Sequence, residues 1–166
     1  MIPSIRRLCA VALLAGALPL HAAAQEKTDK SKFELTAEEQ TLIDLTNQER
    51  KKEKLPALRP NETLVKVARA HSANMARQGK MEHVLDGKTP MQRIKASGYV
   101  AAWGGENIAA GEEWPLSDVM QAWMESPEHR KNIVKKEYEE IGIGLARAED
   151  GKIYFTQLFA TPKKTR

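Results

Sequence analysis

The spacing of apolar residues changes once along this chain, and that change constrains the fold more than any other feature. Up to about residue 125, apolar residues recur every three or four positions, as on one face of a helix. Over 141–145 and again over 153–159 they alternate with small or polar residues, as in half-buried strands. Asp150-Gly151 between these runs is a hairpin signal. Helices followed by a hairpin predict an α+β domain in which helices cover a small antiparallel sheet.

Two helices are expected in the first half of the chain. The run Thr36-Ala37-Glu38-Glu39 is a capping box, so a helix begins there. It extends to about residue 54, because Pro56 cannot continue a helix. Asn61 can cap a second helix, and Gly79 is its expected end.

Two shorter helices and one strand are expected in the middle of the chain. Thr89-Pro90 opens a third helix, with proline at the first helical position, and it ends near Gly98. Residues 115–125 form the fourth, with Trp123 directed inward. The segment 105–110 is a candidate for a further strand.

The first 24 residues contain the three parts of a secretory signal peptide in the right order. Arg6 and Arg7 give a positive start, residues 8–20 form an apolar run, and Ala22-Ala23-Ala24 offers a small-residue cleavage site before Gln25. The run is shorter than the roughly 20 residues that a spanning helix needs, and no later stretch is long enough either. The sequence therefore predicts cleavage and a secreted or periplasmic protein.

After cleavage the chain would be one domain with short polar ends. Residues 25–35 are a polar leader, 36–162 form the domain, and 163–166 form a basic tail. The one cysteine, Cys9, would leave with the signal, so stability would depend on packing without a disulfide. The 26 basic and 22 acidic residues are interspersed along the chain. This pattern excludes a nucleic-acid-binding surface. We expect a monomer without a membrane span after cleavage.

Several short motifs occur in an order and spacing that resemble one family. They are Leu45-x-Asn47-x-x-Arg50, Leu55-Pro56-x-Leu58, Ala70-His71-Ser72, Glu82-His83, Gly105-Glu106-Asn107-Ile108-Ala109, Ser126-Pro127-x-His129-Arg130-x-Asn132-Ile133, Glu140-Ile141-Gly142-Ile143-Gly144 and Phe155-Thr156-Gln157-x-Phe159. The chain resembles the bacterial SCP-like branch of the CAP superfamily over residues 42–162. This resemblance implies a three-layer α-β-α sandwich with a large open cleft, but it does not settle function, because one fold hosts many functions.

Three histidines follow the expected cleavage site. His71 lies on the apolar stripe of the second helix, so we expect a core histidine bonded to a backbone group. His83 and His129 each follow an acidic residue outside any apolar pattern. Imidazole is the commonest metal ligand and a proton carrier near neutral pH. The resemblance implies that His83 and His129 face each other across the cleft.

Glu106 follows two glycines, which allow a tight bend and a close approach of the backbone. Two interpretations of this carboxylate remain open. It is either a structural group that accepts backbone N–H bonds or, as the resemblance implies, the cleft acid that pairs with His83.

The family's fourth cleft residue is a second glutamate three positions after the tryptophan, and this chain has Ser126 there. Glu125 and Glu128 flank Ser126, and either one could point inward instead. The resemblance also gives Glu140 a place near the cleft, where it would orient the second cleft histidine or cap a loop.

Two neutral imidazoles and one carboxylate form an incomplete tetrahedral set that leaves a position for water. Such a set suits a catalytic zinc or a weak divalent-cation site. The sequence contains no nucleophile elbow and no His-Glu-x-x-His helix. We therefore expect a non-catalytic binding module whose cleft holds a divalent cation such as zinc and a lipid-like or cell-envelope ligand.

Two alternatives stay open. The first is a hydrolase of peptide or cell-wall material, either metal-assisted or dependent on a His/Glu pair, with His83, Glu106 and His129 as the candidate catalytic residues. The second is an interaction protein that works through its surface and has a relic cleft.

Overall fold

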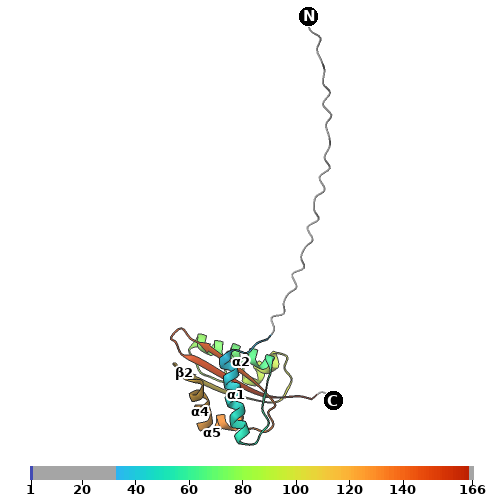
Figure 1. The fold of residues 1–166 in the computed structure, drawn as a ribbon, viewed down its shortest axis with the longest axis vertical. Coiled ribbons are helices and arrows are strands. Elements are labelled where there is room, and N and C mark those ends of the chain that lie inside the picture. Colours follow the sequence, from blue (N-terminus) through green and yellow to red (C-terminus); the bar gives the residue numbers. More distant parts are fainter. Residues whose placement is uncertain (2–32, 165–166) are drawn as a thin grey trace. The chain divides into compact units, whose positions relative to one another are not determined.

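The computed structural model describes Met1 and residues 33–164 (Figure 1). The expected signal peptide, most of the expected leader and the last two residues of the basic tail lie outside this part of the chain. The described residues form these elements, in order: α1 (Ala37–Lys52), β1 (Arg59–Pro60), α2 (Glu62–Gln78), α3 (Pro90–Ala96), β2 (Ala101–Gly111), α4 (Leu116–Glu125), α5 (Pro127–Ile133), β3 (Glu140–Arg147) and β4 (Ile153–Pro162). None of these helices is long and apolar enough to cross a membrane.

The local signals in the sequence set the ends of the two long helices. Glu39 N–H donates to Thr36 Oγ1 at 3.2 Å and Thr36 N–H donates to Glu39 Oε2 at 2.8 Å, so the capping box forms. Asn61 Oδ1 accepts from two amides of the first turn of α2, and Gly79 ends this helix with φ of +63°. All four predicted helices are confirmed to within a few residues.

Two elements were not predicted, and β2 is longer than expected. The helix α5 has seven residues and only Ile133 is buried, so it shows no apolar period. The strand β1 has two residues, both exposed, and pairs in parallel with β3. The sheet is therefore mixed, which corrects the expectation of a purely antiparallel sheet.

The sheet has the strand order β1-β3-β4-β2. The strands β3 and β4 form the predicted hairpin, in which Gly151 has φ of +90° and Ala148 N–H donates to Lys152 O at 2.8 Å. The strand β2 pairs antiparallel with β4 and lies at the edge of the sheet.

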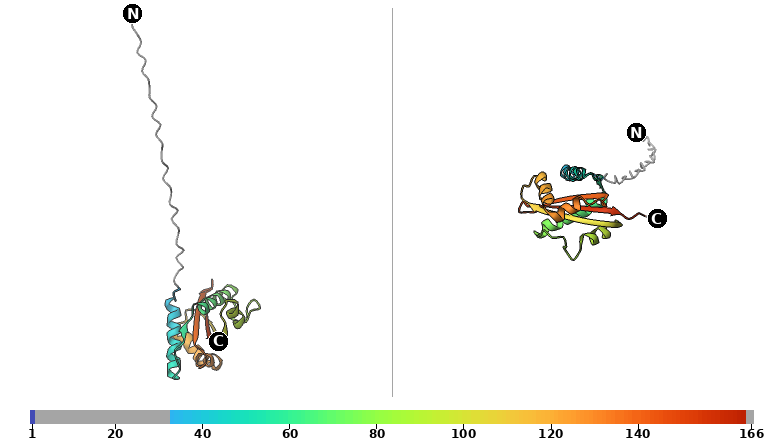
Figure 2. Two further views of the ribbon diagram at one scale, coloured as in Figure 1. Left: turned by 90° about the vertical axis from the view of Figure 1, so that its right-hand side faces the viewer. Right: turned by 90° about the horizontal axis from the view of Figure 1, so that it is seen from below.

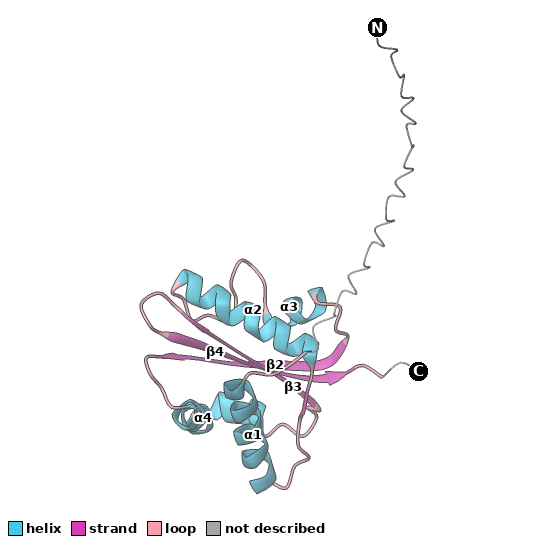
Figure 3. Ribbon diagram, turned by 45° about the horizontal axis from the view of Figure 1, so that its top comes forward, coloured by secondary structure: helices cyan, strands magenta, loops and turns pink. Residues whose placement is uncertain are grey.

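Alternate residues of β3 face opposite sides of the sheet, because Ile141 and Ile143 belong to the larger core while Gly142 and Gly144 lie against α2. A Cβ atom on Gly142 would collide with the main chain of Leu64, and one on Gly144 would collide with the main chain of Arg69. The helix α2 thus rests directly on this face of the sheet, with α3 beside it (Figure 3). Figure 2 shows the sheet from below, with α1 on its other side. The predicted three-layer α-β-α arrangement is confirmed.

The larger core lies between the sheet and the layer of α1, α4 and α5. Trp123 is 1% exposed there and donates from Nε1 to Ile108 O at 3.1 Å. The buried apolar residues of this larger core include Leu42, Ile43, Val119, Trp123, Ile141, Ile143, Phe155 and Phe159. Two smaller clusters join α2 to β4, one with Leu64 and Leu158 among its members and the other with Met75 and Tyr154.

Candidate functional site

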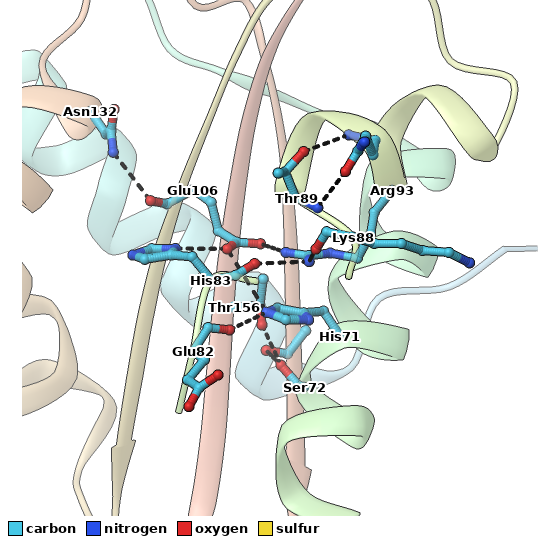
Figure 4. A network of polar contacts seen from close by, with 12 residues as sticks. His71, Ser72, Glu82, His83, Lys88, Thr89, Arg93, Glu106, Asn132 and Thr156 are labelled. Carbon is cyan, nitrogen blue, oxygen red and sulfur yellow. Dashed lines mark hydrogen bonds and ion pairs between the residues drawn. The ribbon is translucent and has the colours of Figure 1, made fainter. Parts of the chain in front are cut away.

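The carboxylate of Glu106 is the centre of a buried charge cluster (Figure 4). Its side chain is only 1% exposed, and the residue lies on the edge strand β2. Oε1 is 2.8 Å from His83 Nδ1, and Oε2 is 2.6 Å from Arg93 Nη2. Both oxygens therefore have a side-chain partner. The structure places Glu106 and His83 together, as the family resemblance implied.

His83 is held by one ring nitrogen only. An ionised carboxylate can only accept hydrogen bonds, so we assign the proton of a neutral His83 to Nδ1. Its Nε2 then carries a lone pair. The side chain is 48% exposed and belongs to the connection between α2 and α3. This arrangement presents an oriented, accessible imidazole nitrogen.

Arg93 on α3 was not identified from the sequence. Besides its ion pair with Glu106, its Nη1 donates to the carbonyl oxygens of His83 at 2.9 Å and Lys88 at 2.8 Å. Its side chain is 13% exposed. Nothing in the local pattern distinguishes this arginine from others on helices, because its three partners come from a loop and a strand.

His71, on α2, lies next to this cluster and is buried. It is 1% exposed and its Nε2 lies 3.1 Å from Glu82 O, so the expected core histidine bonded to a backbone group is confirmed. Nε2 is also 3.8 Å from Glu106 Oε1. Burial lowers the pKa of His71 below its usual value, and the Glu106 charge partly opposes this. His71 is therefore neutral near pH 7.

His129 belongs to α5, which is bonded to β2 next to Glu106. Asn107 Nδ2 donates to His129 O at 3.1 Å, and Asn132 Nδ2 lies 3.2 Å from Glu106 O and 2.9 Å from Asn107 Oδ1. These amides fasten α5 to β2. Burial lowers the pKa of His129, and the nearby His83 lowers it further.

The buried guanidinium of Arg50 binds main-chain carbonyls at the end of α5 and in the segment after it. Arg50 is 0% exposed, and it donates to the carbonyl oxygens of Pro56, Ile133, Lys135 and Tyr138 at 2.8–3.3 Å. These bonds join the end of α1 to the end of α5 and to the segment that leads into β3. The placement of His129 therefore depends on a residue far from it in the sequence.

The glutamates considered for the fourth cleft position differ in their surroundings. Glu125 is exposed and accepts from Gln121 Nε2 at 2.8 Å. Ser126 stands before α5 without a side-chain capping bond. Glu128 is exposed, and its charge raises the pKa of His129 against the two larger effects. Of these residues, Glu128 is thus the one whose charge reaches the site.

Glu140 does not orient His129. Its carboxylate accepts from Tyr99 Oη at 2.7 Å and from Asn61 Nδ2 at 2.9 Å. Asn61 is the N-cap of α2, so Glu140 supports this helix end. The expectation of a direct role in the cleft is corrected, while the alternative of a capping role agrees with these bonds.

The donor set limits which metal chemistry the site can support. Within residues 33–164, no group of three or more His, Cys, Asp and Glu side chains is arranged to hold a metal ion. Both oxygens of Glu106 are already engaged, which leaves His83 and His129 as donors. Two imidazoles are too few for a closed structural zinc site, and a cation held by them would take its remaining ligands from water.

Comparison with known proteins identifies the family. Residues 43–159 match the cysteine-rich secretory protein family, CAP, and the chain belongs to this family. The Bacillus subtilis protein YkwD is 36% identical over 140 residues, which cover 84% of this chain and 53% of YkwD. A Borreliella burgdorferi protein is 32% identical over 114 residues, covering 69% of this chain and 72% of that one. The chain thus spans about half the length of YkwD.

Solved structures show the same fold. An outer surface protein from Borrelia burgdorferi has a TM-score of 0.73 at 29% identity, covering 80% of this chain and 98% of that one. An extracellular SCP-domain protein from Bacillus anthracis has a TM-score of 0.67 at 27% identity, covering 78% and 45%. NaASP2, solved with Zn²⁺, shares the fold with a TM-score of 0.55 at 14% identity, covering 78% and 85%. The bacterial SCP-like type predicted from the sequence is confirmed.

Proposed function

We propose that this chain is an exported binding module whose cleft holds a divalent cation through His83 and His129. The observation that carries the proposal is the 2.8 Å contact between His83 Nδ1 and Glu106 Oε1. A carboxylate bonded to one ring nitrogen fixes the ring and directs the other nitrogen toward a metal, as at many metal-ligating histidines. Glu106 acts here as the orienting group and His83 Nε2 as the donor atom.

The second donor also meets the requirement for ligation. A histidine must be neutral to bind a metal. Burial and the neighbouring His83 lower the pKa of His129, so its imidazole is neutral near pH 7. A bound cation would accept a lone pair from one ring nitrogen of each histidine, and water would complete its coordination. The solved structure of NaASP2 with Zn²⁺ makes zinc the natural first test.

The second part of the proposal is a lipid-like or cell-envelope ligand. A cavity of about 550 Å³ lies between α3 and the start of β2, and Met91, Ile94, Tyr99, Val100, Lys95 and Lys163 are among the residues that line it. Apolar walls with a few polar groups are typical of ligand pockets, and two lysines suit an anionic group. The helix α3 that lines this cavity also carries Arg93 of the charge cluster.

Export is supported by the three-part signal at the start of the chain. It also agrees with two relatives that are named an outer surface protein and an extracellular protein. N-terminal sequencing of the protein purified from its host should begin at Gln25, within a residue or two. Retention of Arg6 and Arg7 would contradict export by cleavage.

Isothermal titration with zinc at pH 7.5 tests the cation site. Residues 25–166 should bind one zinc, and His83→Ala and His129→Ala should each lose most of this affinity. At a zinc concentration 100 times the Kd, mass action stabilises the fold by about 2.7 kcal/mol, which raises Tm by roughly 5–12 °C. His71→Gln is the matched control and should keep the shift. Equal affinity in the His83/His129 double variant would refute the site.

The hydrolase alternative depends on the pair of His83 and Glu106. With Glu106 bonded to Nδ1, the Nε2 atom of His83 could accept a proton from water. Ser72 and Thr156 are not available as nucleophiles, since both are buried and their hydroxyl oxygens lie 2.8 Å apart. Turnover of a peptide or peptidoglycan library by wild type, with none by His83→Ala, would favour this alternative.

A further inference from the structure

The connection between α2 and α3 carries His83 but has little apolar packing of its own. Met81 is 50% exposed and Val84 is 49% exposed. Leu85, at 5%, is its one buried apolar residue between Lys80 and Thr89. Segments with few buried contacts open at low free-energy cost. The position of His83 must therefore be set by polar contacts.

Arg93 supplies two of those contacts to the main chain of this connection. Its Nη1 donates to His83 O at 2.9 Å and to Lys88 O at 2.8 Å (Figure 4). The two carbonyls stand five residues apart, so one guanidinium closes the loop between them. The Nη2 of the same group contacts Glu106 Oε2 at 2.6 Å, on the strand β2.

These contacts hold His83 at two points. Arg93 binds the main-chain carbonyl of His83 directly, and it binds the ring through Glu106, whose other oxygen lies 2.8 Å from Nδ1. We propose that Arg93 is a positioning residue that fixes this loop and holds the His83 ring with Nδ1 toward Glu106 and Nε2 toward the cleft. The inference concerns the apo site and rests on the proposed function only for its effect on the cation.

The buried charge of Glu106 explains why position 93 needs a positively charged side chain. A carboxylate that is 1% exposed is costly unless it is paired. Arg93 is always charged, so it compensates Glu106 without using a proton of either histidine. The other groups facing Glu106 are His83 at 2.8 Å and His71 at 3.8 Å. Without Arg93, the Oε2 atom of Glu106 would lose its contact, and the orientation of the carboxylate against the His83 ring would no longer be fixed.

Geometry explains why the residue is an arginine. Its planar fork reaches three acceptors on different segments at 2.6–2.9 Å. A lysine has one charged nitrogen and lacks this fork. Arg93→Lys should therefore retain the pairing with Glu106 but release the loop, whereas Arg93→Met should lose both. The two variants separate the electrostatic role from the tethering role.

The test uses residues 25–166 without zinc and has two readouts. Amide hydrogen exchange should accelerate at least about tenfold over 79–89 in Arg93→Met and Arg93→Lys, and stay unchanged in α1 and β3. Imidazole ¹⁵N spectra should show one Nδ1–H form of His83 in wild type and in Arg93→Lys, and a mixture of Nδ1–H and Nε2–H forms in Arg93→Met. Arg147→Gln, at an exposed arginine that ends β3 and bonds only to Gly151 O in its own hairpin, is the control and should match wild type over 79–89.

The inference is overturned if both Arg93 variants keep wild-type exchange over 79–89 and the wild-type His83 ring form. If Arg93→Met does not fold, Arg93→Lys decides, because the loop must still be released while the ring form is kept. Zinc titration separates this inference from the proposed function. A wild type that binds no zinc but shows these Arg93 effects would refute the cation site and leave the positioning role standing.

Discussion

His83 Nδ1 and Glu106 Oε1 lie 2.8 Å apart, although 23 residues separate them in the sequence. The strand β2 brings the carboxylate to the edge of the sheet, and the connection after α2 brings the ring to it. The contact fixes one ring nitrogen and leaves the other accessible. The proposed cation site depends on this relationship.

Replacing Glu106 with glutamine tests the orienting role of the carboxylate. Glu106→Gln keeps the shape of the side chain but removes the charge, so zinc affinity should fall about 10–100-fold. The Arg93 guanidinium would lose its charged partner, which should cost about 1–3 kcal/mol of unfolding free energy. Calorimetry and urea unfolding measure the two effects. Unchanged zinc affinity in a folded variant would show that the His83 ring needs no carboxylate behind it.

Trp123 should contribute strongly to stability in a domain without disulfides. The ring is 1% exposed and its Nε1 donates to Ile108 O at 3.1 Å. Trp123→Ala should therefore lower the unfolding free energy by about 3–5 kcal/mol in denaturant titrations. Trp123→Phe keeps most of the packing and removes the hydrogen bond, so it should cost less. A loss below about 1 kcal/mol in the alanine variant would be inconsistent with a buried ring.

Capping residues and turn residues in the sequence correctly predicted the starts of the two long helices and the β3–β4 hairpin. Thr36 and Asn61 cap the helices that their sequence context indicated, and Asp150-Gly151 forms the hairpin turn. The helix α5 escaped prediction because a seven-residue helix with one buried residue shows no period. The parallel strand β1 escaped because two exposed residues carry no strand pattern.

The site was predictable in its residue types but not in its contacts. The family resemblance pointed to His83, Glu106 and His129, and the structure joins the first two by a hydrogen bond. Arg93 could not be found from the sequence, because its partners are two main-chain carbonyls and a carboxylate from another element. The family resemblance offered Glu140 either the orientation of His129 or the capping of a loop, and the bonds from Tyr99 and Asn61 agree with a capping role.

The buried His71 should make folding stability depend on pH. Burial lowers its folded-state pKa below the usual 6.5. Between the two pKa values the unfolded chain binds the extra proton, so the unfolding free energy falls as the pH drops below about 6.5. This contribution is complete above that pH, and its slope can reach about 1.4 kcal/mol per pH unit.

His71→Gln isolates this contribution, because glutamine does not titrate and can still donate to Glu82 O. As the pH falls from 7 to 5, the unfolding free energy of wild type should decrease relative to that of His71→Gln. Urea unfolding at four pH values measures it, and effects of other titrating groups cancel in the difference. A difference that stays constant over this range would mean that His71 charges as easily in the fold as in the unfolded chain.

The most direct test of the cation site is a zinc titration followed by long-range ¹H–¹⁵N imidazole spectra of residues 25–166 at pH 7.5. The account predicts that His83 Nε2 and one ring nitrogen of His129 shift together and reach saturation at one zinc per chain. His83 Nδ1 should keep its proton, and His71 should not move. Zinc-induced shifts at His71, or no shift at His83 and His129, would contradict the account.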